Sequence, residues 1–364
     1  MKIAFDHTIF LIQKYGGVTR YFCQIFNSIK NKHKTKILSP FYQSKFLKNY
    51  SKDVIRLKNI DNIPKYTTKL LNYTNLVINN SYLKVWKPDI IHKTYYNDFK
   101  YKFINTKKVL NVWDLSHEIY HYMYNKPKNW RPKEKALKTV DHIICSSKKT
   151  QRDLVKYYDI EIDKTSIVYQ STPNLSDNIN LNKDKNRNLL FVGSRKKYKN
   201  FEKLLEAFSL NLQILKDFNL ICFGEEDISV EEKYLIEKYN LNKKNIFFEK
   251  GNDKKLSELY MSSRALIYPS KNEGFGFPPL EAMSYGCPVI TSNNDAILEA
   301  TGLNEYSFDP EDPRDILNKI EKVIYSNDTI ENLMKYGLNR VKNFSTEKTF
   351  NNIDNIYNKI ISGI

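Results

Sequence analysis

The sequence is poor in cysteine, glycine and proline, and it has no long apolar run. Its four cysteines lie far apart and form no Cys-x-x-Cys pair, which supports neither a disulfide framework nor a zinc site. Only 11 glycines and 12 prolines occur in 364 residues, so the chain is neither collagen-like nor of low complexity.

The sequence also lacks the apolar segments that targeting and membrane insertion require. No window approaches about 18 uncharged apolar residues, the length of a membrane span. Asp6 and His7 interrupt the amino-terminal segment where a signal peptide needs an unbroken apolar run. We therefore expect a cytoplasmic protein, without a signal peptide or a transmembrane helix.

Positive charge is in excess, but in one half of the chain only. Residues 1–180 hold 32 of the 58 Lys and Arg residues and only 14 of the 41 Asp and Glu residues, a net charge of +18. Residues 181–364 carry a net charge of −1. A bias in genome composition should act on both halves alike, so the asymmetry favours an anionic partner near the amino-terminal half.

Short apolar segments alternate with longer amphipathic ones along the chain. The first half of this pattern predicts strands at residues 3–5, 36–38, 90–92, 109–112, 142–145 and 166–169, with helices at 19–29 and 132–139. The second half predicts strands at 189–192, 219–223, 246–248, 265–268 and 288–291, with helices at 201–210, 230–239, 254–262 and 278–285. Such alternation is typical of α/β domains in which helices cover a parallel sheet.

A polar stretch separates the two alternations. Residues 171–188 contain Pro173 and repeated Asn and Asp, and they carry no apolar period. We predict a doubly wound α/β domain at residues 1–172, a linker at 173–187 and a second doubly wound domain at 188–344. Two such sheets leave a cleft that the carboxyl ends of the strands face, and open α/β sheets bind ligands at those ends.

Residues 268–290 carry the clearest signal for chemistry. A buried-type strand is followed by Gly274 and Gly276 and then by a helix that begins at Pro278. Glycine lets a ligand approach the backbone N–H groups, and the dipole of the helix favours negative charge at its start. We interpret the segment as a turn that accepts a phosphate.

Two carboxylates flank this turn. Glu273 lies in the loop and Glu281 in the first part of the helix, eight residues further on. Bound phosphate would repel a carboxylate, so these two should face hydroxyl groups, to which each can offer several acceptor sites. The hydroxyls of a sugar or of a ribose fit this requirement.

With these residues in view, the segment resembles the Glu-x7-Glu signature of retaining glycosyltransferases of family 4. Members of that family have the GT-B fold, which consists of two Rossmann-like domains facing a cleft. The resemblance implies that Glu281 binds the ribose of the donor nucleotide and that Glu273 lies at the donor sugar and its phosphate. It also implies that Gly274, Phe275 and Gly276 line the donor.

The basic loop at residues 193–199 resembles the family's diphosphate-binding loop. Arg195 and Lys199 are the candidates to hold the diphosphate, where fixed cations stabilise the transition state more than the ground state as the sugar bond breaks. Lys196 and Lys197 also lie in this run, and their alternative role is that of solvated side chains.

Three segments of the first half, and one at the end of the chain, extend the resemblance. Gly16 and Gly17 match a Gly-Gly loop that approaches the donor phosphate and the acceptor. Where the family commonly has His-Asp this chain has Trp113-Asp114, so His117 is our candidate to contact a sugar hydroxyl or the reacting face. His92 is a second candidate on the acceptor side, and a purely structural role stays open for both histidines. Residues from about 345 to 364 resemble a terminal helix that returns to the first domain.

The resemblance predicts a hexosyltransferase that moves a sugar, with retention, from a UDP- or GDP-sugar to an acceptor hydroxyl in glycan, polysaccharide or glycolipid synthesis. No metal is expected, because Arg195, Lys199 and the helix would neutralise the diphosphate and nothing resembles an Asp-x-Asp metal site. The basic first domain would take the acceptor, so we expect an anionic glycan or lipid-linked acceptor and peripheral membrane association.

Two other functions stay open at this point. A basic protein rich in Tyr and Phe could bind nucleic acid, although the phosphate turn and the acid pair fall in the half without excess charge. The same fold could also catalyse another reaction on nucleotide sugars or glycans, such as epimerisation or phosphorolysis.

Overall fold

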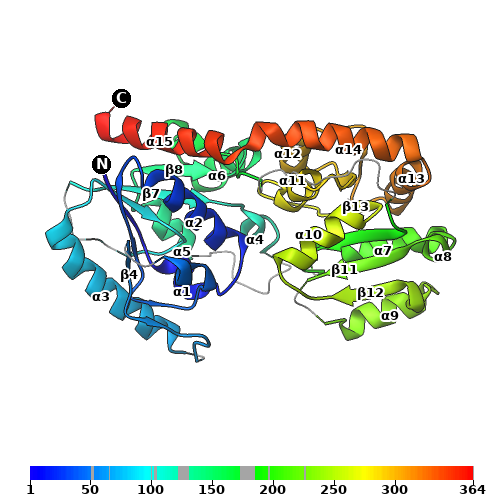
Figure 1. The fold of residues 1–364 in the computed structure, drawn as a ribbon, viewed down its shortest axis with the longest axis horizontal. Helices are drawn as coiled ribbons and strands as arrows, with labels where there is room; N and C mark the ends of the chain where they lie inside the picture. Colours follow the sequence, from blue (N-terminus) through cyan, green and yellow to red (C-terminus); the bar gives the residue numbers. More distant parts are fainter. Residues whose placement is uncertain are drawn as a thin grey trace. The chain divides into compact units, whose positions relative to one another are not determined.

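A computed structural model describes residues 1–50, 53–64, 66–99, 101, 105–121, 131–172, 185–195, 197–224 and 227–363. The chain divides into two compact units (Figure 1). Unit 1 comprises Met1–Trp113, Lys126–Gln170 and Thr346–Ile364, and unit 2 comprises Asp114–Asn125 and Ser171–Ser345. Most of the predicted linker, residues 173–184, falls outside the described residues, as does Lys196.

Unit 1 is built on a seven-stranded sheet in the order β4-β2-β1-β6-β7-β8-β9, in which every neighbouring pair is parallel. The central strands are apolar and buried, as expected where helices cover both faces. Its helices are α1 (Thr8–Ile12), α2 (Gly17–Ile29), α3 (Thr68–Trp86), α5 (Arg131–Leu137), α6 (Lys148–Tyr158) and α15 (Thr346–Ser362). Its strands are β1 (Lys2–Phe5), β2 (Lys34–Leu38), β4 (Val54–Ile55), β6 (Ile90–Lys93), β7 (Lys107–Val112), β8 (His142–Cys145) and β9 (Thr165–Ile167), and β3 (Phe41–Tyr42) pairs separately with β5 (Lys58–Asn59).

The last helix of the chain packs into the core of unit 1. Phe350, Ile353 and Tyr357 of α15 share one buried cluster with residues of β1 and α2, among them Phe5 and Phe22. Burial of these large side chains joins residues more than 300 positions apart in the sequence, so unit 1 is completed only by the carboxyl-terminal helix.

Unit 2 contains a six-stranded parallel sheet in the order β12-β11-β10-β13-β14-β15. Its strands are β10 (Asn188–Val192), β11 (Asn219–Phe223), β12 (Ile246–Glu249), β13 (Ala265–Tyr268), β14 (Val289–Ser292) and β15 (Ser307–Phe308). Its helices are α4 (Ser116–Ile119), α7 (Phe201–Leu210), α8 (Ile214–Asp217), α9 (Val230–Lys238), α10 (Asp253–Ser262), α11 (Phe277–Ser284), α12 (Asp295–Thr301), α13 (Pro313–Ile324) and α14 (Asn327–Val341). The two parallel, helix-covered sheets confirm the predicted fold class.

The strand order fixes where unit 2 can bind a ligand. The chain runs from β10 outward through β11 and β12, and then returns to place β13 on the other side of β10. The loops that follow β10 and β13 therefore leave the sheet in opposite directions and open a crevice between them. The basic loop follows β10 and the loop with Glu273 follows β13, so both reach this crevice.

The cysteines and the apolar composition of the helices bear on disulfide formation and on membrane insertion. Cys23, Cys145, Cys222 and Cys287 are buried free thiols. Among the described residues, no helix combines the length and the apolar composition needed to cross a membrane.

Candidate active site

The loops after β10 and β13 are held together at the crevice of unit 2. The backbone N–H of Lys271 donates to the carbonyl of Tyr198 at 2.7 Å, and Asn200 donates through Nδ2 to the carbonyl of Pro269 at 3.1 Å. Asn200 caps α7 with a left-handed backbone (φ 63°), which Asn tolerates better than most residues. These contacts fix Lys199 beside the second loop.

Lys199, Glu273 and Tyr268 form a closed triangle of hydrogen bonds. Lys199 Nζ lies 2.6 Å from Glu273 Oε1 and 2.9 Å from the hydroxyl oxygen of Tyr268. The Tyr268 hydroxyl in turn donates to the same Oε1 atom at 2.8 Å. Lys199 and Glu273 are largely buried, and Tyr268 is fully buried. Two donors thus hold one oxygen of the carboxylate.

The charges of this triangle are stabilised by one another. Burial alone would lower the pKa of Lys199, but the Glu273 carboxylate and smaller contributions from Tyr198 and Asp114 together outweigh burial, and the pKa is raised. Burial and then Glu273 raise the pKa of Tyr268 well above its usual value. Lys199 is therefore an ammonium and Tyr268 a neutral hydroxyl donor at neutral pH.

Arg195 lies in a different ion pair. Its Nε donates to Glu232 Oε1 at 2.8 Å, and its Nη2 donates to the carbonyl of Asp227 at 2.9 Å. The guanidinium stacks on the ring of Phe248 at 4.7 Å, and Glu232 also completes the capping box of α9. That Arg195 and Lys199 hold one diphosphate together stays a prediction. Each cation has its own carboxylate, because Glu232, which no motif singled out, takes Arg195.

The start of α11 has the backbone that the glycine-rich loop predicts. Gly276 caps this helix with φ 96°, and a Cβ atom there would lie 3.3 Å from the Cα of Ile297. Glycine is required for both reasons. Pro278 lies in the first turn, where its missing N–H has no partner to lose.

Glu281 and Phe275 are both buried, with different partners. The hydroxyl of Tyr260 donates to Glu281 Oε2 at 3.2 Å, and burial followed by Glu281 raises the pKa of Tyr260 well above its usual value. Phe275 packs edge-on against Phe344, with ring centroids 5.6 Å apart. Phe275 thus contributes to packing, and its place in the donor lining stays a prediction.

The helix α4 lies against the Glu273 loop within unit 2. Asn272 donates through Nδ2 to Ser116 Oγ at 3.0 Å, and Tyr120 stacks on Tyr198 with centroids 6.4 Å apart. The predicted domain division placed this segment in the first domain, whereas Asp114–Asn125 groups with unit 2 through these contacts. His117 is the second residue of α4 and is half-buried.

The predicted residues of unit 1 have their own surroundings. Gly17 begins α2, and Gln13 Oε1 occupies the start of this helix by accepting from Thr19 N at 3.0 Å and from Thr19 Oγ1 at 2.7 Å. A Cβ atom on Gly16 would collide with the same Gln13 side chain. Gly16 and Gly17 thus form a tight turn, and Gln13 takes one of the N–H groups that a phosphate would need.

His92 is a core residue of unit 1. Its Nδ1 lies 2.6 Å from the hydroxyl of Tyr357, its Nε2 lies 2.5 Å from Asn111 Oδ1, and the side chain has no exposed surface. Burial lowers the pKa of His92 to about 4. The neutral ring fastens α15 to the sheet, so the structural role that the sequence left open is the one observed.

Sequence reasoning missed the two tyrosines that hold the carboxylates. Tyr268 is the last residue of β13 and Tyr260 lies in α10. In the sequence, both belong to apolar patterns that indicate packing and not binding. A signal for Tyr268 existed, because a hydroxyl at the carboxyl end of a buried strand needs a polar partner at that edge. Within the described residues, no group of three or more His, Cys, Asp and Glu side chains could hold a metal ion.

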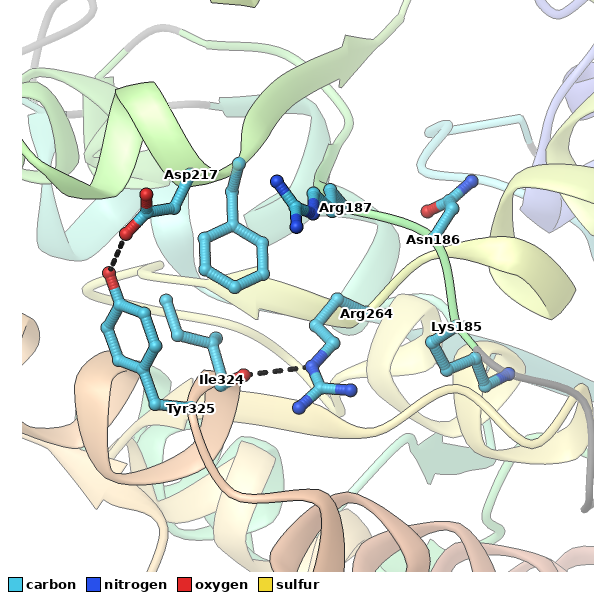
Figure 2. A pocket seen from close by; sticks show the side chains of 8 residues that line it. Lys185, Asn186, Arg187, Asp217, Arg264, Ile324 and Tyr325 are labelled. Atoms are coloured by element: carbon cyan, nitrogen blue, oxygen red, sulfur yellow. Dashed lines mark hydrogen bonds between the residues drawn. The ribbon is translucent and has the colours of Figure 1, made fainter.

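A separate hollow of about 330 Å³ lies at the opposite ends of the strands of unit 2 (Figure 2). It is lined by Lys185, Asn186, Arg187, Asp217, Phe218, Arg264, Ile324 and Tyr325. Arg264 donates to the carbonyl of Ile324 at 2.9 Å, and Tyr325 donates to Asp217 at 2.9 Å (Figure 2). These groups join the end of α13 to the sheet, and none of them belongs to the Glu273 site.

Comparisons with known proteins show which family the chain resembles over most of its length. The family model of glycosyl transferases group 1 matches residues 174–340, and that of glycosyltransferase family 4 matches residues 15–171. The O-antigen chain mannosyltransferase RfbU of Salmonella typhimurium is 29% identical over 203 residues, which are 55% of this chain and 56% of that protein. The chain therefore matches little more than half the length of this curated relative, and a smaller share of the next one.

Solved structures share the fold over the whole chain. Sucrose-phosphate synthase from Thermosynechococcus elongatus has a TM-score of 0.75 at 18% identity and covers 100% of both chains. HepE of Anabaena, in complex with UDP and glucose, has a TM-score of 0.74 at 16% identity, covering 99% of this chain and 100% of the other. These likenesses confirm the GT-B fold class.

Proposed function

Because the chain belongs to the group 1 and family 4 glycosyltransferases, we propose that it transfers a sugar, with retention, from a nucleotide diphosphate sugar to an acceptor hydroxyl. The observation that carries this proposal is the triangle of Lys199, Glu273 and Tyr268 at the crevice of unit 2. A cation, an aligned carboxylate and the start of α11 meet where an open α/β sheet binds its ligand.

The proposed roles follow from the chemistry of each group. Glu281, held by Tyr260, accepts hydrogen bonds from the ribose hydroxyls, as two carboxylate oxygens near a diol can. Lys199 and the backbone N–H groups of Gly276 and Phe277, which precede the two prolines of α11, take the diphosphate. The attraction between this positive charge and the diphosphate becomes stronger as the leaving group gains negative charge. The proposed mechanism therefore needs no metal ion.

Donor binding then changes the partner of Lys199. Without a ligand the ammonium is paired with Glu273, and a diphosphate competes for it with a larger charge. Tyr268 keeps its hydrogen bond to Glu273 and holds the carboxylate at the sugar. Glu273 acts by positioning and by stabilising positive charge on the sugar, and the leaving phosphate accepts the proton of the acceptor.

The remaining predicted residues receive secondary roles. His117 is placed on α4, which contacts the Glu273 loop through Ser116 and Asn272, and we assign it to the reacting face. The turn at Gly16 and Gly17 serves the acceptor or the donor phosphate from unit 1. Arg195, whose pairing with Glu232 orders the basic loop, holds the diphosphate together with Lys199.

The donor is proposed to be a UDP- or GDP-sugar, and the acceptor an anionic glycan or lipid-linked sugar. HepE has been solved with UDP, and RfbU is a mannosyltransferase, so both nucleotides belong in a test. The excess of positive charge in residues 1–180 supports an anionic acceptor and peripheral membrane association.

Slow transfer to water tests the proposal without knowledge of the acceptor. The protein is incubated with single UDP- and GDP-sugars in the presence of a metal chelator, and the released nucleoside diphosphate and the anomeric form of the sugar are followed by NMR. We expect release from one donor with the anomeric configuration retained, and loss of release in Glu273→Gln. Release that requires a divalent metal, or inversion at the anomeric carbon, would contradict the mechanism.

A further inference from the structure

Helix α3 in unit 1 carries polar side chains toward the sheet. Asn75 clamps Phe41, accepting from its N–H at 2.8 Å and donating to its carbonyl at 2.9 Å. Asn79 donates to the carbonyl of Leu38 at 3.1 Å, and both asparagines are fully buried. These hydrogen bonds to the backbone hold the inner face of the helix, together with the apolar side chains of Leu76, Leu83 and Trp86 that pack against the unit. Other apolar side chains of α3 take no part in this attachment.

Those apolar side chains lie on the outer face of α3. Leu70 and Tyr73 are each 65% exposed, Val77 is 48% exposed and Val85 is 84% exposed. Leu70, Tyr73 and Val77 are spaced by three and four residues, so they form one stripe along the helix. Figure 1 shows α3 on the outside of unit 1. A helix of a water-soluble domain normally turns such a stripe inward.

The charge around the stripe has one sign. Between Asp61 and Asp89 the sequence contains four lysines and no Asp or Glu. Lys69 and Lys84 lie on the helix itself, and both are exposed. An apolar stripe with tyrosine, bordered by lysines and free of acids, has the properties of a helix that lies flat in the headgroup region of a membrane.

We propose that the outer face of α3, made by Lys69, Leu70, Tyr73, Val77, Lys84 and Val85, binds the surface of a membrane that contains anionic lipids. Lipid headgroups attract the lysines, and the acyl boundary accepts the apolar stripe. Nucleic acid would account for the lysines alone and would leave the stripe exposed to water. This proposal rests on the proposed function, which includes membrane association, and it names the surface that binds the membrane. Its test does not depend on sugar transfer.

The test measures flotation of the full-length protein with vesicles. Vesicles of phosphatidylcholine alone are compared with vesicles in which about one third of the lipid is phosphatidylglycerol. One variant combines Leu70→Ser, Tyr73→Ser and Val77→Ser. Its matched control combines Leu210→Ser, Val230→Ser and Tyr234→Ser, three exposed apolar residues of unit 2. A third variant, with Lys69→Gln and Lys84→Gln, tests the charge.

We expect the wild type to float with the anionic vesicles only, and added salt to weaken this binding. The α3 serine variant should bind at least about tenfold more weakly, the lysine variant several-fold more weakly, and the unit 2 control as the wild type. All variants should keep the wild-type midpoint of thermal unfolding, which shows that they fold.

Three results would overturn the proposal. The wild type could bind no vesicles, or the α3 serine variant could bind as well as the unit 2 control. The wild type could also be a dimer that the α3 serine substitutions dissociate, without vesicle binding, which would make a second copy the occupant. Stabilisation of the protein by nucleoside diphosphates is recorded on the same samples, so that failure at α3 and failure of the donor site are separable.

Discussion

Lys199 Nζ lies 2.6 Å from Glu273 Oε1, and the two residues come from loops 74 positions apart in the sequence. Each loop follows one of the two strands that border the crevice of unit 2. The ion pair is largely buried, so its two charges depend on each other, and a substitution at either position leaves an uncompensated charge.

Replacement of Glu273 by Gln should lower kcat by about 100-fold and change the affinity for the donor much less. The carboxylate is proposed to act on the reacting sugar, whereas the nucleotide is bound by other groups. Donor affinity is measured by calorimetric titration and kcat by release of nucleoside diphosphate. Glu311→Gln is the control, because Glu311 is an exposed carboxylate that pairs with Lys271 on the same loop. Equal losses in kcat and affinity for Glu273→Gln would contradict the assigned role.

The two buried tyrosines should divide between turnover and binding. Tyr268→Phe removes a hydrogen bond to Glu273 and should lower kcat by about tenfold, whereas Tyr260→Phe removes one to Glu281 and should weaken donor binding by about tenfold. Each variant is the matched control of the other, since both delete one buried hydroxyl. If both variants changed the same parameter, the separate roles of the two carboxylates would be wrong.

The contribution of the ion pair to stability should depend on pH in one direction. The folded protein raises the pKa of Lys199 above its ordinary value of 10.5, because Glu273, with Tyr198 and Asp114, outweighs burial. The pair therefore stabilises the fold below about pH 10.5, and this stabilisation is lost as the pH rises through the folded pKa. The free energy of unfolding is compared for the wild type and Glu273→Gln. Their difference should shrink as the pH rises from about pH 7, because burial without Glu273 lowers the pKa of Lys199 in the variant, which gains stability when this lysine loses its proton. A difference that grows above about pH 10 would contradict the assignment.

Gly276→Ala should destabilise unit 2 by about 1 to 3 kcal/mol. The left-handed backbone at this position is costly for alanine, and the new methyl group would press on Ile297. Gly17→Ala is the control, because nothing lies within 4 Å of a Cβ atom built there. Urea unfolding of both variants gives the comparison. If Gly276→Ala were as stable as Gly17→Ala, the conformation of the loop before α11 would be wrong.

Much of the fold could be predicted because strands of parallel sheets are short, apolar and bounded by polar loops. The predicted strands 219–223 and 265–268 coincide with β11 and β13. The sequence does not predict helix α3, because asparagines share its inner face with apolar residues while other apolar residues lie on its outer face, so no clear apolar period results. The sequence pattern also does not predict the last elements of unit 2, from α12 to α14.

The candidate site could be predicted only as far as local motifs reach. Glu273 and Glu281 follow from one contiguous segment, and Lys199 from another. The partner of Arg195 could not be predicted, because Glu232 lies 37 residues away on a helix whose pattern shows only a cap. The grouping of Asp114–Asn125 with unit 2 depends on single side-chain contacts such as Asn272 to Ser116, which no periodicity records.

Thermal unfolding with nucleoside diphosphates tests the central claim, a donor site at Glu273 and Glu281, most directly. The wild type, Glu281→Ala and the control Glu331→Ala, which removes an exposed carboxylate of α14, are each mixed with UDP, GDP and their sugars in the presence of a metal chelator. The account predicts that one nucleotide raises the midpoint of the wild type and of Glu331→Ala, and that Glu281→Ala loses this shift. No shift with any nucleotide, or the same shift in Glu281→Ala, would contradict it.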